Sequence, residues 1–111
     1  MISRAQFAEA IRGEPGLPAL FRQRAADVTA MEERRLDESY LEFLDSQIEL
    51  SPRGPEWTAV LVRRRAALLS YCGVILCSGT VRVGDTMYIA KLHPATGRVV
   101  HWEEWDCGPV P

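Results

Sequence analysis

The last third of the chain constrains the fold more than any other part, because strand-forming runs alternate there with tight-turn signals. Val74–Val83 is rich in β-branched residues, and Thr86–His93 follows it as a second run. The Gly-Asp pair between them suits a two-residue hairpin turn whose glycine takes positive φ. Pro94–Gly97 has Pro first and Gly last, as in four-residue turns, and leads to a third run, Arg98–Asp106. The segment therefore predicts a three-stranded antiparallel meander.

The N-terminus carries a clear helix start. Ser3 and Gln6 form an S-x-x-Q capping box, in which each side chain accepts a hydrogen bond from a backbone N–H of the first turn. A helix is therefore expected over Arg4–Arg12, ending at Gly13, the usual C-terminal breaker.

In the meander, Gly79 interrupts the first strand and predicts a β-bulge there.

The stretch 19–51 contains neither Gly nor Pro, and its apolar residues recur at helical spacing. We interpret it as two helices with a break or kink near Glu33–Asp37, where the apolar stripe slips around the helix. Two ambiguities stay open. Gln47–Ser51 also fits a short strand, and Trp57–Tyr71 fits a helix or a strand, with the helix favoured. The stripe consists of Phe21, Ala25, Val28 and Met31, then Leu36, Tyr40, Leu44 and Ile48.

Together these elements predict a single α+β domain over residues 1–111, with N-terminal helices packed on a C-terminal antiparallel β-meander. A chain of 111 residues has room for one domain. A formal net charge of −2 gives no general attraction to nucleic acid or to an anionic membrane. No run approaches about 20 apolar residues, and the N-terminus lacks the core of a signal peptide, so we expect a cytoplasmic protein without a membrane span.

The cysteines, Cys72, Cys77 and Cys107, are an odd number in a chain with no export signal. We expect reduced thiols, two of them packed in the core. Their spacing is not that of a zinc knuckle, and His93 and His101 do not complete a known ligand pattern. The glycine-rich phosphate loops and zinc-hydrolase motifs are missing as well, so neither a metal nor a cofactor is expected.

The most distinctive stretch is the third run of the meander, where three carboxylates interleave with two tryptophans. We predict that it binds a protein partner, because Trp is frequent among binding hot spots and negative charge attracts a basic partner. Alternation of strand faces puts at least one tryptophan in the core. The alternative is that the tryptophans close the core while the acids face solvent. The predicted partner-binding residues are Trp102, Glu103, Glu104, Trp105 and Asp106.

A second hypothesis concerns chemistry. His101 and Glu103 lie two apart on one strand face, where they could act as a general acid–base pair. With Tyr88 on the preceding strand, His101 is the candidate for a pocket between helices and sheet. The alternative is a polar row facing solvent, or a histidine stacked between aromatic neighbours. No residue is assigned as catalytic.

Residues 57–106 resemble the NTF2-like, cone-shaped α+β superfamily in their order of helices and curved antiparallel strands. The stretch Gly79–Trp105 looks like the closing strands of such proteins, with a Pro-Ala-Thr-Gly turn followed by Arg-Val-Val-His-Trp-Glu-Glu-Trp. The resemblance implies a family that includes small-molecule isomerases and dehydratases, subunit adaptors, and immunity proteins of polymorphic toxin systems. The family's pocket aspartate matches no position of this chain, so no catalytic residue is carried over.

Three classes of function follow. The first is a bacterial immunity protein, a toxin inhibitor that binds and neutralises a cognate toxin with a basic domain. The second is a structural or adaptor subunit, or a homodimer, whose apolar helical stripes serve assembly. The third is a small-molecule enzyme with a pocket at His101 and Tyr88. The acidic and aromatic third strand favours the first.

Overall fold

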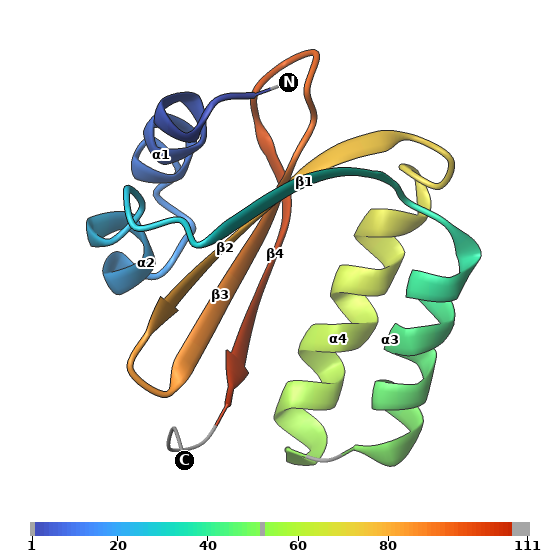
Figure 1. The fold of residues 1–111 in the computed structure, drawn as a ribbon. Coiled ribbons are helices and arrows are strands. Elements are labelled where there is room, and N and C mark those ends of the chain that lie inside the picture. Colours follow the sequence, from blue (N-terminus) through green and yellow to red (C-terminus); the bar gives the residue numbers. More distant parts are fainter. Residues whose placement is uncertain (1, 52, 108–111) are drawn as a thin grey trace. The chain divides into compact units, whose positions relative to one another are not determined.

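A computed structural model describes residues 2–51 and 53–107 (Figure 1). Its four strands form one antiparallel sheet in the order β1-β2-β3-β4, which confirms the α+β class with helices first and strands last. The sheet has one strand more than expected. In chain order the elements are α1 (Arg4–Arg12), α2 (Ala19–Gln23), β1 (Ala30–Arg35), α3 (Glu38–Leu50), α4 (Gly54–Leu69), β2 (Ile75–Val83), β3 (Thr86–Leu92) and β4 (Val99–Asp106).

The described chain is organised as two compact units. The first runs through residue 34 and resumes at Ile75, so it holds α1, α2 and the sheet. The second spans Arg35–Val74 and holds α3 and α4. The second unit is therefore an insertion between the first two strands of the sheet.

The first helix forms as the sequence predicts. The Ser3 hydroxyl accepts a hydrogen bond from the Gln6 N–H at 3.1 Å, and the Gln6 side chain accepts one from the Ser3 N–H at 2.8 Å. At the other end, the Gly13 N–H donates to the Glu9 carbonyl at 3.0 Å. The capping box and both helix boundaries are confirmed.

The expectation of two long helices between residues 19 and 51 is wrong for its first half. Helix α2 stops at Gln23, and Ala30–Arg35 forms strand β1. Phe21, Ala25 and Val28 are all buried, as their helical spacing suggested, but only Phe21 lies in a helix. The apolar spacing marked the side of the chain that faces the core and not its secondary structure.

Pairing with β2 explains why this segment becomes a strand. The Thr29 N–H donates to the Thr80 carbonyl at 2.9 Å, so the chain enters the sheet just before β1. Within β1, Arg34 lies 4.0 Å from Glu32. Such charged residues suit the edge of a sheet, because they discourage pairing with another chain. Hydrogen bonding to a distant strand thus overrides the local helical pattern.

Both hairpin turns of the meander form where the sequence places them. Gly84 has a φ of 60°, and the turn joins Val83 to its directly opposite partner Thr86. The predicted bulge at Gly79 is wrong, because Gly79 pairs with Ala90 in regular register. The irregularity lies instead in the next strand pair, at Lys91/Leu92.

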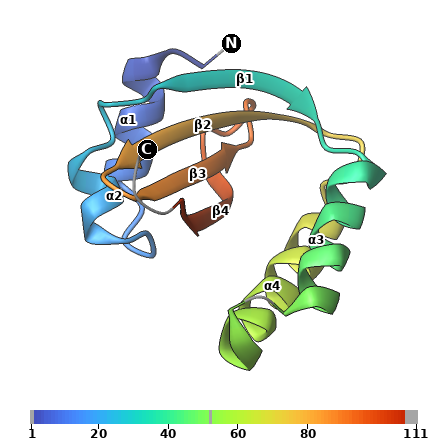
Figure 2. The ribbon, with the colours of Figure 1, turned by 60° about the horizontal axis from the view of Figure 1, so that its bottom comes forward.

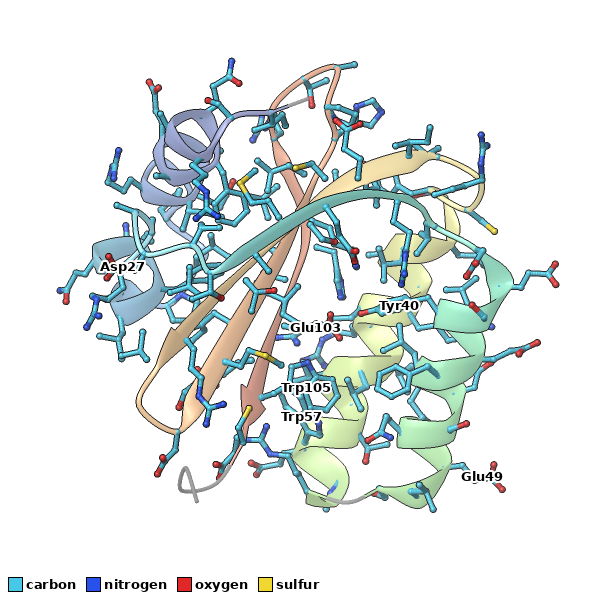
Figure 3. The ribbon with its side chains drawn as sticks, viewed as in Figure 1. Asp27, Tyr40, Glu49, Trp57, Glu103 and Trp105 are labelled. Atoms are coloured by element: carbon cyan, nitrogen blue, oxygen red, sulfur yellow. The ribbon has the colours of Figure 1, made fainter. Side chains whose placement is uncertain are left out.

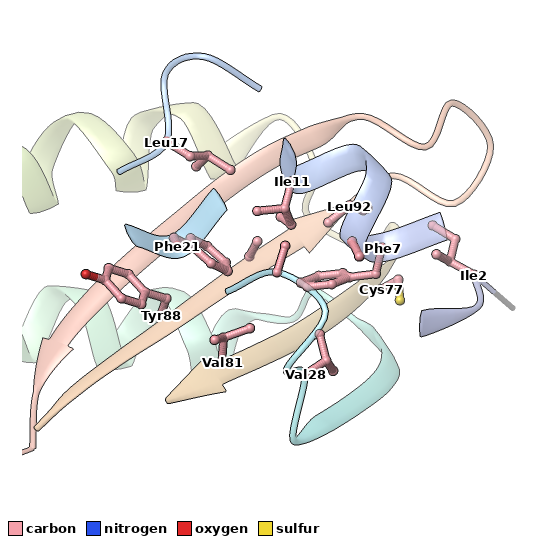
Figure 4. Packing of buried hydrophobic residues seen from close by; sticks show 13 residues of the cluster. Ile2, Phe7, Ile11, Leu17, Phe21, Val28, Cys77, Val81, Tyr88 and Leu92 are labelled. Carbon is pink, nitrogen blue, oxygen red and sulfur yellow. The ribbon is translucent and has the colours of Figure 1, made fainter. Parts of the chain in front are cut away.

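The core of the first unit lies between one face of the sheet and helices α1 and α2 (Figure 4). Strands β2 and β3 contribute alternate residues to it, which is the period-2 pattern of a sheet with one buried face. The core residues are Ile2, Phe7, Ala8, Ile11, Leu17, Phe21, Ala25, Val28, Cys77, Val81, Tyr88, Ala90 and Leu92.

The second unit is a two-helix hairpin, with α3 and α4 side by side and antiparallel (Figures 1 and 2). Hydrogen bonds close its base: the Gly73 N–H donates to the Leu36 carbonyl at 2.7 Å, and the Leu36 N–H to the Val74 carbonyl at 2.9 Å. The helix expected over Trp57–Tyr71 is confirmed, although it begins earlier and ends at Leu69. The strand option for Gln47–Ser51 is wrong, since α3 continues through that segment. Among the described helices, none has the length and apolar character needed to cross a bilayer.

Candidate functional site

A row of polar side chains crosses the sheet of the first unit. Ser78 on β2 lies opposite Lys91 on β3, which in turn lies opposite His101 on β4. The Lys91 ammonium donates a hydrogen bond to the Ser78 hydroxyl at 2.9 Å. Direct cross-strand partners share a face of the sheet, so the three side chains project from the same side.

The structure brings His101 and Glu103 together on this face. His101 Nε2 and Glu103 Oε2 are 3.8 Å apart, and the two residues are only 5% and 2% exposed. Figure 3 shows Glu103 and Trp105 along β4. At this distance the carboxylate acts on the imidazole through its charge, and acid–base chemistry would need the two groups to come within hydrogen-bond distance.

The pKa of Lys91 is lowered from its ordinary value. Burial is the main cause, because it disfavours the charged ammonium. The carboxylates of Glu103 and Glu32 act in the opposite direction and favour the charged form, while Arg34 adds to the lowering. The lysine is therefore held in a site where its charge is costly, with acids close by that partly compensate.

Tyr88 belongs to the opposite face. It is 4% exposed, its ring stacks on Phe21 with centroids 5.0 Å apart, and it forms part of the core (Figure 4). Burial raises the pKa of Tyr88, and the charge and hydrogen bond of Glu104 raise it further. Tyr88 and His101 therefore do not line one pocket. Tyr88 is three positions from Lys91, the direct partner of His101, and an odd spacing puts two strand residues on opposite faces.

The five predicted partner-binding residues do not form one surface either. Trp102 packs against the core, and Glu103 is buried on the other face. Glu104 is half-buried and hydrogen-bonded to Tyr88. Trp105 is half-buried, and of the five only Asp106 is exposed. The acids and tryptophans of this strand are divided between two faces, as strand alternation requires.

The hairpin unit carries four of the six exposed large hydrophobic side chains of the described residues, and none of the four was among the predicted site residues. Four large hydrophobic side chains of the two helices are exposed, whereas the rest of the described chain exposes only Leu20 and Ile75. A monomeric soluble domain normally covers such residues, and groups of them mark interaction sites. The four are Phe43, Leu50, Val62 and Leu69.

Two arginines of α4, Arg64 and Arg65, contact other side chains of the hairpin. The Arg65 guanidinium pairs with the Asp45 carboxylate of α3 at 2.5 Å. Two guanidiniums lie over the ring of Trp57, with Arg53 4.3 Å and Arg64 5.2 Å from the ring centroid. Through these contacts, the guanidinium groups of Arg53, Arg64 and Arg65 interact with side chains of the same unit.

The positions of the three cysteines differ from the expectation that two of them are packed in the core. Cys77 is buried in the core, where burial raises its pKa, but Cys72 and Cys107 are exposed. Only one of the three cysteines is therefore packed in the core, where two were expected. In the part of the chain that the structure describes, no three His, Cys, Asp or Glu side chains come together as a metal site would require.

Neither protein-family models, nor curated proteins, nor solved structures gave a match to this chain.

Proposed function

We propose that this chain is a protein-binding domain, and that it acts as an immunity protein which binds and neutralises a bacterial toxin. The observation that carries the binding role is the inserted hairpin. Its base is closed by its own hydrogen bonds, and its helices expose Phe43, Leu50, Val62 and Leu69. Apolar side chains presented on helices are a common means of recognising another protein.

The negative charge of helix α3 supports a partner whose binding surface is basic. Helix α3 contains four acidic residues and no Lys, Arg or His, and three of the four acids have no basic partner among the ion pairs of the hairpin described above. The acids are Glu38, Glu42, Asp45 and Glu49. Many toxin domains act on nucleic acid and need positive charge to do so, so an acidic protein surface is suited to covering them.

The experiment is affinity capture of the tagged full chain from a lysate of its native cells, followed by reconstitution. The captured protein is purified, mixed with the chain, and its toxic activity is assayed with and without the chain. The proposal expects a complex of defined stoichiometry in which that activity is inhibited. A captured protein that does not bind the purified chain, or whose activity is unchanged in the complex, contradicts it.

The polar row of the sheet favours a second candidate function, hydrolysis through an activated serine. The Lys91 amine and the Ser78 hydroxyl are within hydrogen-bond distance, and a lysine whose amine is neutral can accept the proton of a serine nucleophile. A fluorophosphonate reagent tests this directly: the serine oxygen would bond phosphorus, fluoride would leave, and the lysine would take the proton. Labelling at Ser78 that disappears in Lys91→Met supports this candidate, and unlabelled Ser78 excludes it.

A further inference from the structure

One face of the hairpin combines an apolar row with an acidic row. On α4, Thr58, Val62, Arg65 and Leu69 are spaced four, three and four residues apart, so they form a single row along the helix. On α3, Glu38, Glu42, Asp45 and Glu49 have the same spacing and form a second row. Each row follows the heptad pattern by which helices present one side to a neighbour.

Two contacts show that the rows lie next to each other. The Arg65 guanidinium reaches the Asp45 carboxylate at 2.5 Å, and the Thr58 hydroxyl is 2.6 Å from that of Ser51, which caps α3. Because the helices run antiparallel, these contacts place Val62 near the Glu49 end of the acidic row. Leu69 accordingly lies near its Glu38 end.

The apolar side chains of this face are exposed to solvent. Val62 and Leu69 are 50% and 53% exposed, and they are seven residues, or about 10.5 Å, apart along α4. Ala59 and Ala66 continue the apolar surface on the side away from α3, and both are exposed. Their small side chains allow the backbone of a second helix to approach closely.

The acidic part is open as well. Glu38, Glu42 and Glu49 are exposed, and Figure 3 shows Glu49 projecting outward from the C-terminal end of α3. No basic residue on α3 opposes them, and the nearest arginine of the apolar row, Arg65, is already paired with Asp45. A partner that covers Val62 and Leu69 therefore meets a row of negative charge along one side.

We propose that this face, the acidic hairpin face, binds an amphipathic helix of a protein partner whose apolar residues repeat every seven positions and whose flanking residues are Lys or Arg. The proposal rests on the protein-binding function above and identifies its surface. The apolar residues of the helix would cover Val62 and Leu69, and its cations would lie along Glu38, Glu42 and Glu49. A second copy of the hairpin is a poorer occupant, because α3 would bring the same acids to the contact.

The test uses the full chain and two designed helical peptides labelled with a fluorophore. Both have leucine at positions a and d of the heptad; one has lysine at the flanking e and g positions, and its twin has glutamate there. Fluorescence anisotropy gives each Kd. We expect the lysine peptide to bind at least tenfold more tightly than the glutamate peptide, and its Kd to rise with salt. Equal binding of the two peptides, or no binding of the lysine peptide up to about 1 mM, overturns the proposal.

Substitutions locate the binding. Val62→Asp with Leu69→Asp should raise the Kd of the lysine peptide at least tenfold, since two exposed apolar contacts are lost. Leu20→Asp is the control: it changes a 41% exposed leucine of α2, outside the hairpin, and should leave the Kd within about twofold. Glu42→Lys with Glu49→Lys should reverse the preference toward the glutamate peptide. Circular dichroism confirms that each variant remains folded.

The binding experiments distinguish an error in the proposed binding surface from an error in the proposed function. If the captured native partner binds the Val62→Asp, Leu69→Asp variant as tightly as the unchanged chain, the protein-binding function stands and the acidic hairpin face is wrong. If the face binds the lysine peptide as expected but no captured protein is inhibited, the face stands and the toxin-neutralising function is wrong.

Discussion

The ring of Phe7 occupies the space that a side chain on Gly79 would need. A Cβ built on Gly79 would lie 2.4 Å from two atoms of that ring, and Phe7 is completely buried. Helix α1 therefore approaches the sheet over a position that has no side chain. The glycine in the middle of β2 is explained by this close approach and not by a bulge.

Gly79→Ala should lower the free energy of unfolding by about 1–3 kcal/mol, because the new methyl overpacks the core. The backbone at Gly79 does not have positive φ, so the effect is steric. Thermal or urea unfolding measures it, with Gly16→Ala as control, since its nearest neighbour is a side-chain oxygen 3.7 Å away. In a Phe7→Ala background the same change should cost little; an equal cost in both backgrounds would show that Phe7 is not the cause.

The capping box should contribute measurably to stability. Ser3→Ala removes the oxygen that accepts the Gln6 N–H, and the expected loss is about 1 kcal/mol in the free energy of unfolding. Ser46→Ala serves as control, because that hydroxyl bonds the Glu42 carbonyl inside a helix, where Ala is the better helix former. A Ser3→Ala loss no larger than that of the control would contradict a capping role.

The lowered pKa of Lys91 makes stability depend on pH. Below the pKa that Lys91 has in the folded protein, its side chain is charged in both the folded and the unfolded state, and burying that charge is unfavourable. Between that pKa and 10.5, the side chain is neutral in the folded state and still charged in the unfolded state. The unfolded state then binds more protons, so stability rises with pH in this window. The free energy of unfolding of the unchanged chain should thus rise relative to Lys91→Met as the pH is raised toward 10.5, as urea titrations can measure. A constant difference would argue against the lowered pKa.

Two carboxylates of β4, those of Glu103 and Asp106, should differ in how much their removal lowers the free energy of unfolding. Glu103→Ala removes a 2% exposed carboxylate that lies 3.8 Å from His101, and should cost about 1–3 kcal/mol of stability. Asp106→Ala changes an exposed residue at the end of the same strand, and should stay within about 0.5 kcal/mol. Urea unfolding of both variants gives the comparison. Similar losses for the two would mean that Glu103 is not held as the structure describes.

The parts of the fold that local chemistry determines could be predicted from the sequence. The capping box at Ser3, the turn at Gly84 and the helix over most of Trp57–Tyr71 each depend on residues a few positions apart. Strand β1 could not be predicted in this way. Its only large apolar residue is Met31, and it is held by pairing with β2, more than forty residues further along the chain.

The candidate sites were predicted only in part, for a related reason. Strand alternation correctly places His101 and Glu103 on one face, but whether that face is buried depends on distant elements. The sequence also placed Tyr88 with His101, although strand register puts them on opposite faces. The exposed row of Val62 and Leu69 has a recognisable heptad spacing, yet that spacing alone does not tell a covered helix face from an open one.

Calorimetric titration of the purified chain with the protein that it captures from native cells shows whether the chain binds a protein partner. We expect a saturable complex of defined stoichiometry that salt weakens, in keeping with a basic partner on an acidic surface. Leu20→Asp, which lies outside the hairpin, should leave that complex intact, and Val62→Asp with Leu69→Asp should disrupt it. Absence of heat and of a complex with any captured protein, using chain shown to be folded, would contradict the protein-binding function.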